Sequence, residues 1–167
     1  MIRQRIYSVF MAFSLGLGMA QCSPKPEAPP PSSASVSLDF SYDLALSMTP
    51  AASAYLKTHP AHLVISAYYY GLPEPAYKQF VTKDGVIGFK TDQVTVDPVD
   101  QTVHMTGEGI ETERLKAIIG PKPLVQITIR AMRKDRQDEH IGCRVFQDYV
   151  ATAQAAPLHM SCDLRTD

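Results

Sequence analysis

The sequence predicts an antiparallel β-sandwich, immunoglobulin-like or transthyretin-like, with one or two short helices and one disulfide. Apolar residues recur at every second position in most segments beyond residue 36, which is the period of a strand with one buried face. Gly, Pro and Asp residues divide these segments into seven or eight short strands, a pattern typical of a sandwich. The chain has 167 residues, 45% of them hydrophobic, which suits one such domain and a tail.

The first half of this domain is expected to hold short strands around one helix. Alternation predicts a strand over 36–44. Thr49 is a helix-capping residue and Pro50 is favoured at the first helical position, so a helix should run from there to about Thr58. The other elements predicted here are a strand over 63–70, a turn at 84–85, short strands over 86–89, 94–96 and 103–105, and a helical turn over 112–119.

The last third of the chain alternates most regularly. We expect strands over 125–131, 141–145 and 158–164. The charged run 134–140 is expected to be an exposed hairpin loop, and the alternative is a docking loop for a partner. In the strand over 141–145, Ile141, Cys143 and Val145 share the apolar face.

The first 21 residues have the layout of an export signal. Arg3 and Arg5 supply positive charge, and an uncharged, mostly apolar run follows over 6–20. This run is short for a membrane span, which needs about twenty residues. We therefore interpret residues 1–21 as a signal peptide.

The end of this signal indicates how it is processed. Met19-Ala20-Gln21-Cys22 resembles the lipobox of bacterial lipoproteins, in which the Cys becomes the lipidated first residue. The sequence departs from that pattern at Gln21, where a small residue is usual. The alternative is cleavage after Ala20, which would release a soluble periplasmic protein.

A Pro/Ser-rich segment separates Cys22 from the domain. Such a composition cannot bury a core, and in polyproline form it reaches on the order of 40 Å. The expected organisation is a signal peptide over 1–21, lipidated Cys22 with its tether over 22–35, and the sandwich over 36–167. The resemblance implies a bacterial envelope protein whose partner is the membrane, through the lipid. Ser23 after the Cys resembles the sorting choice for the outer membrane, facing the periplasm.

The three cysteines agree with this organisation. With Cys22 set aside, Cys143 and Cys162 remain, and both fall on the apolar faces of predicted strands. Exported domains lie in oxidising compartments, so these two are expected to form a disulfide. The alternative is a pair of buried thiols.

The run Tyr68-Tyr69-Tyr70, with Tyr77 nearby, is the candidate binding surface. Alternation places Tyr68 and Tyr70 on one face of their strand and Tyr69 on the other. One face must be core, so the other presents tyrosine to solvent or to a partner. The alternative is the ordinary β-propensity of tyrosine at a strand end.

No pattern in the sequence points to a metal, a cofactor or nucleic acid. His59 and His62 flank Pro60 and have no third ligand at a useful spacing. The net charge of −1 gives no basic field for nucleic acid. The acidic residues Glu108, Glu111 and Glu113 lack a calcium-loop pattern.

Three functions from different classes are compatible with these residues. The first is a non-catalytic envelope lipoprotein whose sandwich binds another envelope or secretion-system protein. In outline, with lipobox, tether, sandwich and a short helix after the first strand, the chain resembles the small outer-membrane lipoprotein of type VI secretion systems. That resemblance is architectural and carries no site residues with it.

The second function is a module that binds a small ligand or glycan through Tyr68 and Tyr70. The third is a small hydrolase that uses His159, Ser161 and Asp163. Those three residues alternate along one strand, and no Gly-x-Ser-x-Gly elbow accompanies them. We interpret them as the polar face of an amphipathic strand, and expect no enzyme.

Overall fold

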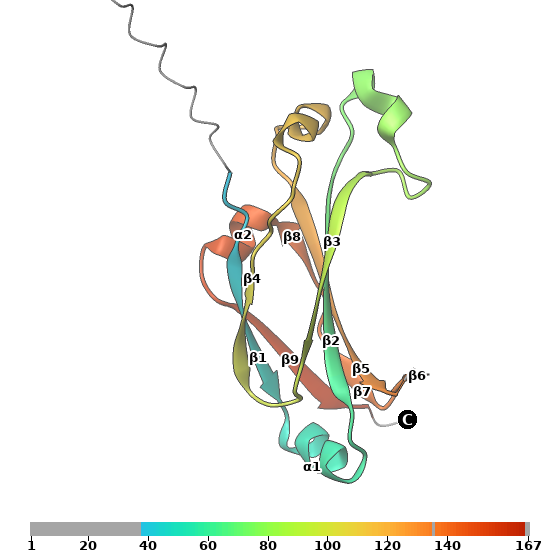
Figure 1. Cartoon of the computed structure of the whole chain (residues 1–167), viewed down its shortest axis with the longest axis vertical. Helices are drawn as coiled ribbons and strands as arrows, with labels where there is room; N and C mark the ends of the chain where they lie inside the picture. The colour runs from blue at the N-terminus through green and yellow to red at the C-terminus, as the bar shows by residue number, and fades with distance from the viewer. Residues whose placement is uncertain (1–37, 135, 166–167) are drawn as a thin grey trace, which may run out of the picture. The chain divides into compact units, whose positions relative to one another are not determined.

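Two facing β-sheets form the domain in the computed structural model, which describes residues 38–134 and 136–165 (Figure 1). The predicted signal peptide 1–21, Cys22 and the tether 22–35 lie outside the described residues. No helix within the described ranges is both long and apolar enough to cross a bilayer. The elements follow in the order β1 (Tyr42–Met48), α1 (Pro50–Thr58), β2 (His62–Gly71), η1 (Pro75–Phe80), β3 (Ile87–Val96), β4 (Gln101–Met105), η2 (Thr112–Ala117), β5 (Leu124–Arg133), β6 (Arg136–Gln137), β7 (Ile141–Cys143), β8 (Phe146–Tyr149), α2 (Val150–Gln154) and β9 (Leu158–Leu164).

The strands pair mainly antiparallel, which confirms the predicted fold class. The first sheet has the order β4-β1-β9-β7. The second has the order β3-β2-β5, and both β6 and β8 pair with β5. Only β1 and β9 run parallel among the described pairs.

The core fills the space between the two sheets. Successive side chains of a strand point to opposite faces, so every second residue is buried. Leu44 and Met160 enter this core from the first sheet, and Ile65 and Ile127 enter it from the second. The alternation read from the sequence is therefore the alternation of burial in the fold.

Two short α-helices cover the ends of the core. The helix α1 begins where Thr49 predicts, because the Thr49 side chain accepts a hydrogen bond from the backbone N–H of Ala52. Ala52 and Leu56 are its buried residues. The helix α2 was not predicted; its Val150 and Ala153 are buried at the other end.

The predicted disulfide is confirmed. Cys143 on β7 and Cys162 on β9 are direct partners across an antiparallel pair, with Cα atoms 4.0 Å apart. Cys162 is fully buried in the core. The bridge therefore joins the edge strand of the first sheet to its neighbour.

The first strand and β3 differ clearly from the prediction. The first strand begins at Tyr42 and continues to Met48, and Leu38 before it is exposed. The predicted strands over 86–89 and 94–96 are one strand, β3. The polar middle of β3 stays paired with β2. Charged side chains can be accommodated there because β3 is an edge strand. Lys90 and Asp92 turn inward and form an ion pair of 2.6 Å.

The prediction that Val145 continues the strand of Ile141 and Cys143 is wrong. Val145 is 61% exposed. The chain leaves the first sheet after Arg144, whose backbone N–H donates to the carbonyl of Ser161. It then joins the second sheet as β8, beside β5.

Candidate functional site

The outer face of the second sheet carries the tyrosines that the sequence singles out. On β2, Tyr69 points into the core and is fully buried. Tyr68 and Tyr70 point to the opposite face, as the alternation predicts. Tyr70 is nonetheless only 6% exposed, although it lies outside the core cluster. Its neighbours on the sheet surface therefore cover it.

Two contacts cover Tyr70. The ring of Tyr68 stacks on it, with centroids 5.4 Å apart and planes 14° from parallel. The side-chain amide of Gln147 on β8 donates a hydrogen bond of 2.7 Å to the Tyr70 hydroxyl. The two tyrosines are thus held in one arrangement before any partner arrives.

A glycine on the neighbouring strand makes room for Tyr68. The register of β2 and β3 shifts between Tyr69 and Tyr70, and Tyr70 lies opposite Gly88. A Cβ atom on Gly88 would lie 2.5 Å from the Tyr68 hydroxyl oxygen. The Tyr68 ring therefore lies over the bare backbone of Gly88, as aromatic rings often do beside an edge glycine.

The registers of the four strands define the rest of this surface, which we call the tyrosine face. Its members share an outward position and carry no charge; beyond Thr128 the same side of β5 continues to the exposed Arg130. The members are Ser66, Tyr68 and Tyr70 on β2, Gly88, Thr91 and Gln93 on β3, Leu124, Gln126 and Thr128 on β5, and Gln147 and Tyr149 on β8. Tyr149 is its most exposed aromatic residue, at 43%. Gln147 and Tyr149 were missed in the sequence, although their alternation with Phe146 and Asp148 was visible there.

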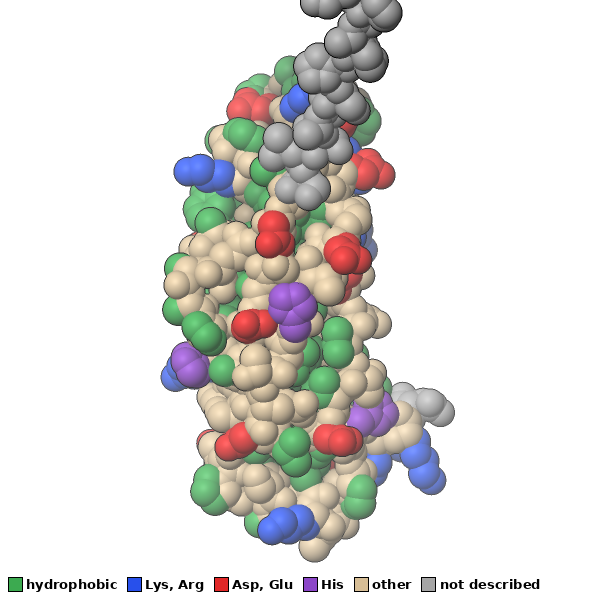
Figure 2. All heavy atoms as spheres, turned by 60° about the vertical axis from the view of Figure 1, so that its left-hand side comes forward, with side chains coloured by type: hydrophobic (Ala, Val, Ile, Leu, Met, Phe, Trp, Pro, Cys, Tyr) green, Lys and Arg blue, Asp and Glu red, His purple; other side chains and the backbone are tan. Residues whose placement is uncertain are grey.

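The outer face of the first sheet differs in charge. Acidic and histidine side chains are scattered over the side of the domain that carries this sheet (Figure 2). Asp43 and His104 form an exposed pair of 2.9 Å there, and Asp163 is also exposed. Within the described residues, the tyrosine face is thus an uncharged part of the second sheet, bounded on β5 by the exposed Arg130.

The tyrosine face also lies outside the well-formed hollows of the domain. The lining of five well-formed hollows on the described surface includes no residue of this face. Small-molecule sites are concave, whereas protein interfaces are often broad and flat. The shape of this face therefore fits a macromolecular surface.

Tyr77 does not join the other two tyrosines. It lies on η1, where its ring stacks on Phe80 with centroids 6.3 Å apart. It is half-buried against the core. The structure thus brings Tyr68 and Tyr70 together and places Tyr77 on a separate element.

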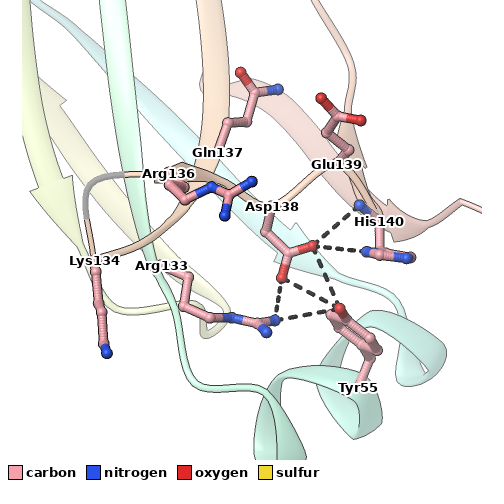
Figure 3. A pocket seen from close by; sticks show the side chains of 8 residues that line it. All are labelled: Tyr55, Arg133, Lys134, Arg136, Gln137, Asp138, Glu139 and His140. Carbon is pink, nitrogen blue, oxygen red and sulfur yellow. Dashed lines mark hydrogen bonds and ion pairs between the residues drawn. The ribbon is translucent and has the colours of Figure 1, made fainter.

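A second cluster lies beside α1, in the run 134–140 that was predicted to be an exposed loop. That prediction is wrong for Asp138, whose side chain is only 3% exposed. Figure 3 shows Arg133 and His140 pointing at the Asp138 carboxylate, with Tyr55 of α1 beside it. The backbone N–H of Asp138 donates to the carbonyl of Ala131, so the loop folds back onto β5.

The hydrogen bonds around Asp138 keep it ionised. Burial alone would raise the pKa of this carboxyl. The backbone N–H and ring of His140, together with the Arg133 guanidinium, outweigh burial and lower the pKa below its ordinary value. The Tyr55 hydroxyl lies 3.3 Å from the same carboxylate. A carboxylate with this many donors is a structural tie between the loop and α1, not a poised general base.

The three residue types of a hydrolase triad lie on β9. His159 and Asp163 are exposed and Ser161 is half-buried. The Asp163 carboxylate accepts hydrogen bonds from the Thr49 hydroxyl, at 2.6 Å, and from the backbone N–H of Leu164. Among the described contacts, no hydrogen bond joins the side chains of His159, Ser161 and Asp163 to one another.

The histidines that flank Pro60 lie on different elements, because His59 ends α1 and His62 begins β2. The His59 ring stacks on Tyr55, with centroids 4.3 Å apart, at the end of α1. Across the ranges that the structure describes, no group of three or more His, Cys, Asp or Glu side chains is placed to hold a metal ion. Family models, curated proteins and solved structures gave no match to this chain.

Proposed function

We propose that this protein is a non-catalytic lipoprotein of the bacterial cell envelope, whose sandwich binds another envelope protein through the tyrosine face. The observation that carries the proposal is the tyrosine face, an uncharged part of the outer face of the second sheet with Tyr68 and Tyr70 stacked at one end. The export signal, Cys22 and the tether support the anchored location. The location is then the periplasmic side of the outer membrane.

The composition of the tyrosine face supports a protein partner. The centres of protein interfaces are depleted of charge and enriched in tyrosine, because a tyrosine ring is apolar and its hydroxyl can bond. A solvent-facing sheet ordinarily carries charged residues on its wet side. Replacing those with Gln, Thr and Tyr removes charge that a partner would otherwise have to desolvate.

The rigidity of this face also favours binding. Tyr70 is fixed by Tyr68 and Gln147, so little side-chain entropy remains to be lost when a partner covers it. Tyr149 and Gln126 lie beside this stack, and Tyr149 is free to make the exposed contacts. The expected partner surface is therefore complementary in hydrogen bonding, without a charged centre.

Photo-cross-linking in living cells tests the proposal. A photoreactive residue at Tyr149, and in a second variant at Thr91, samples the tyrosine face at exposed positions. The control is the same residue at Thr102, which is exposed on the first sheet. We expect one dominant envelope protein to be captured from both positions on the tyrosine face and not from Thr102. The same adducts from all three positions, or none from a folded domain, would overturn the proposal.

A charge placed on this face gives an independent readout. Gln126→Arg should abolish co-purification of the captured protein, because it buries an unpaired charge in the interface. Thr102→Arg should leave co-purification unchanged. Both variants should keep the circular dichroism and melting temperature of the parent chain.

Two further experimental outcomes would indicate a different function for this protein. Thermal stabilisation by glycans or small ligands, lost in Gln126→Arg, would indicate a ligand-binding module. Labelling by a serine-directed probe, lost in Ser161→Ala, would indicate a hydrolase. The proposed function predicts neither of these results.

A further inference from the structure

Three large hydrophobic side chains are exposed at one end of the sandwich. Leu72, Phe80 and Ile119 are 49%, 53% and 55% exposed. The backbone N–H of Ile119 donates to the carbonyl of Leu72, which places these two residues side by side. Phe80 ends η1, the short helix that follows Leu72 along the chain. We call these three residues the apolar end.

The fold holds these side chains outward. Ile118, the neighbour of Ile119, is 1% exposed and pairs with Pro73 in a β-bridge. Gly71, the neighbour of Leu72, is buried at the end of β2. Because neighbouring residues of extended backbone face opposite sides, Ile119 points away from the core that Ile118 enters. Leu72 likewise points away from the side on which the Ile118 side chain packs against Gly71.

The chain enters the sandwich at this same end. Leu38 and Asp39, the first described residues, line a hollow together with Thr112, the first residue of η2. Figure 1 shows the first described residues at the end of the domain that also carries η1, η2 and α2, with the C-terminus and α1 at the opposite end. The first described residues therefore lie at the same end of the domain as η1 and η2.

We propose that Leu72, Phe80 and Ile119 contact the lipid bilayer that anchors Cys22, so that the domain stands on the membrane with this end against it. The inference rests on the proposed function, because the lipid on Cys22 supplies the bilayer. The occupant follows from where the described chain begins: the bilayer that holds Cys22 is joined to the domain through the segment that leads to Leu38, at this end, and not through α1.

The local composition fits a membrane interface. Leu, Ile and Phe side chains enter the boundary between headgroups and acyl chains, while lysine heads remain in water. Lys78 and Lys122 are exposed on the segments that carry the three apolar residues. The lipid on Cys22 raises the local concentration of the bilayer, so even a weak contact is populated.

This placement also has a consequence for the tyrosine face. The strands of the second sheet run from the apolar end toward α1, so their outer face would look sideways, along the membrane plane. Tyr68 and Tyr70 lie near the membrane end of that face. A partner captured there is then a membrane protein, or a protein held close to the membrane.

A single-tryptophan reporter tests the contact, because the chain contains no Trp. Phe80→Trp and Ile119→Trp place the reporter in the apolar end. Val99→Trp is the matched control, since Val99 is 54% exposed and lines a hollow with Pro50 and Leu56 of α1 at the other end. Each mature chain from residue 22 is coupled through the Cys22 thiol to a maleimide lipid in vesicles of phosphatidylethanolamine and phosphatidylglycerol. Cys143 and Cys162 are bridged and do not compete for this coupling.

We expect the emission of both apolar-end reporters to move to shorter wavelength on coupling and to be quenched by brominated lipid, while the Val99→Trp emission does neither. Equal responses from all three reporters, or no response from the apolar end, would overturn the inference. A shift without quenching, growing with protein density, would indicate contact between copies of the chain and would also overturn it. The coupling is chemical, so the result does not depend on lipidation in cells or on a protein partner.

Discussion

The hydroxyls of Tyr42 and Tyr69 are joined by a hydrogen bond of 3.3 Å in the buried space between the two sheets. Tyr42 belongs to β1 and Tyr69 to β2, so one polar contact joins the two layers of the sandwich. Both side chains are buried, at 4% and 0% exposed. A buried hydroxyl without a partner is costly, so each of these residues depends on the other.

This dependence predicts non-additive substitutions. Tyr42→Phe and Tyr69→Phe should each lower the free energy of unfolding by about 1 kcal/mol, because each leaves the other hydroxyl unpaired. The double variant should cost less than the sum of the two. Urea unfolding at pH 7 measures the coupling, with Tyr68→Phe on the outer face as the control. Strictly additive losses would show that the hydrogen bond contributes nothing.

The same pair predicts loss of stability at alkaline pH. Burial raises the pKa of Tyr69 to about 12 and raises the pKa of Tyr42 well above its ordinary value of 10. The neutral forms therefore stabilise the fold fully below pH 10, and this contribution is lost as the pH rises through and above that value. The double Phe variant should lose less stability between pH 9 and pH 11 than the parent chain. Parallel pH profiles would contradict the prediction.

Gly107 is a position where an added methyl group should be costly. Its φ of +58° is in the left-handed region, and a Cβ atom there would lie 2.5 Å from the carbonyl oxygen of Phe40. Gly107→Ala should lower the free energy of unfolding by about 3 kcal/mol, because backbone atoms must move as well. Gly85→Ala is the matched control: its φ is +81° but nothing lies within 4 Å, so about 1 kcal/mol is expected. Urea unfolding of both variants gives the comparison, and equal losses would refute the contact with Phe40.

The disulfide should contribute substantially to stability. Cys143 and Cys162 are 19 residues apart, and closing a loop of that length stabilises the fold by about 3 kcal/mol in the chain-entropy account. Cys143→Ser with Cys162→Ser should lower the free energy of unfolding by about that amount, and reduction of the parent chain should reproduce the loss. A reduced parent chain as stable as the oxidised one would contradict the prediction.

The elements that could be predicted are those whose signal is local. Thr49 and Pro50 mark the start of α1 within two residues, and the alternation on β2 and β9 is read along one strand. The faces of Cys143 and Cys162 followed from the same alternation. In each case the burial pattern of one segment carried the information, without reference to its neighbours.

The elements that were missed depend on neighbours. The chain passes from the first sheet to the second at Val145. The apolar positions therefore change from odd residue numbers, ending at Cys143, to an even one at Phe146. This change can be explained only by the pairing of β8 with β5. The polar centre of β3 stays in a strand because β2 pairs with it. For the tyrosine face, the alternation predicted that Tyr68 and Tyr70 share one side of β2. It did not predict that Tyr70 is covered, because its partner Gln147 is 77 residues away.

Asp138 is the clearest non-local case, and it predicts an acid-sensitive loop. Its partners Tyr55 and Arg133 come from α1 and β5, so the charged run 134–140 gave no sign in the sequence that one of its carboxylates is buried.

The pKa of Asp138 is lowered in the fold relative to 3.8, so its carboxylate stabilises the native state above about pH 3.8. That contribution is lost as the pH falls through the folded-state pKa. Asp138→Asn should lower the free energy of unfolding at pH 7 by about 2 kcal/mol. The gap between variant and parent chain should narrow toward pH 3, in urea unfolding followed from pH 7 downward. Glu139→Gln, at an exposed neighbour, is the control and should change little at either pH. If the gap between Asp138→Asn and the parent stays constant with pH, the carboxylate is not the group that ties the loop to α1.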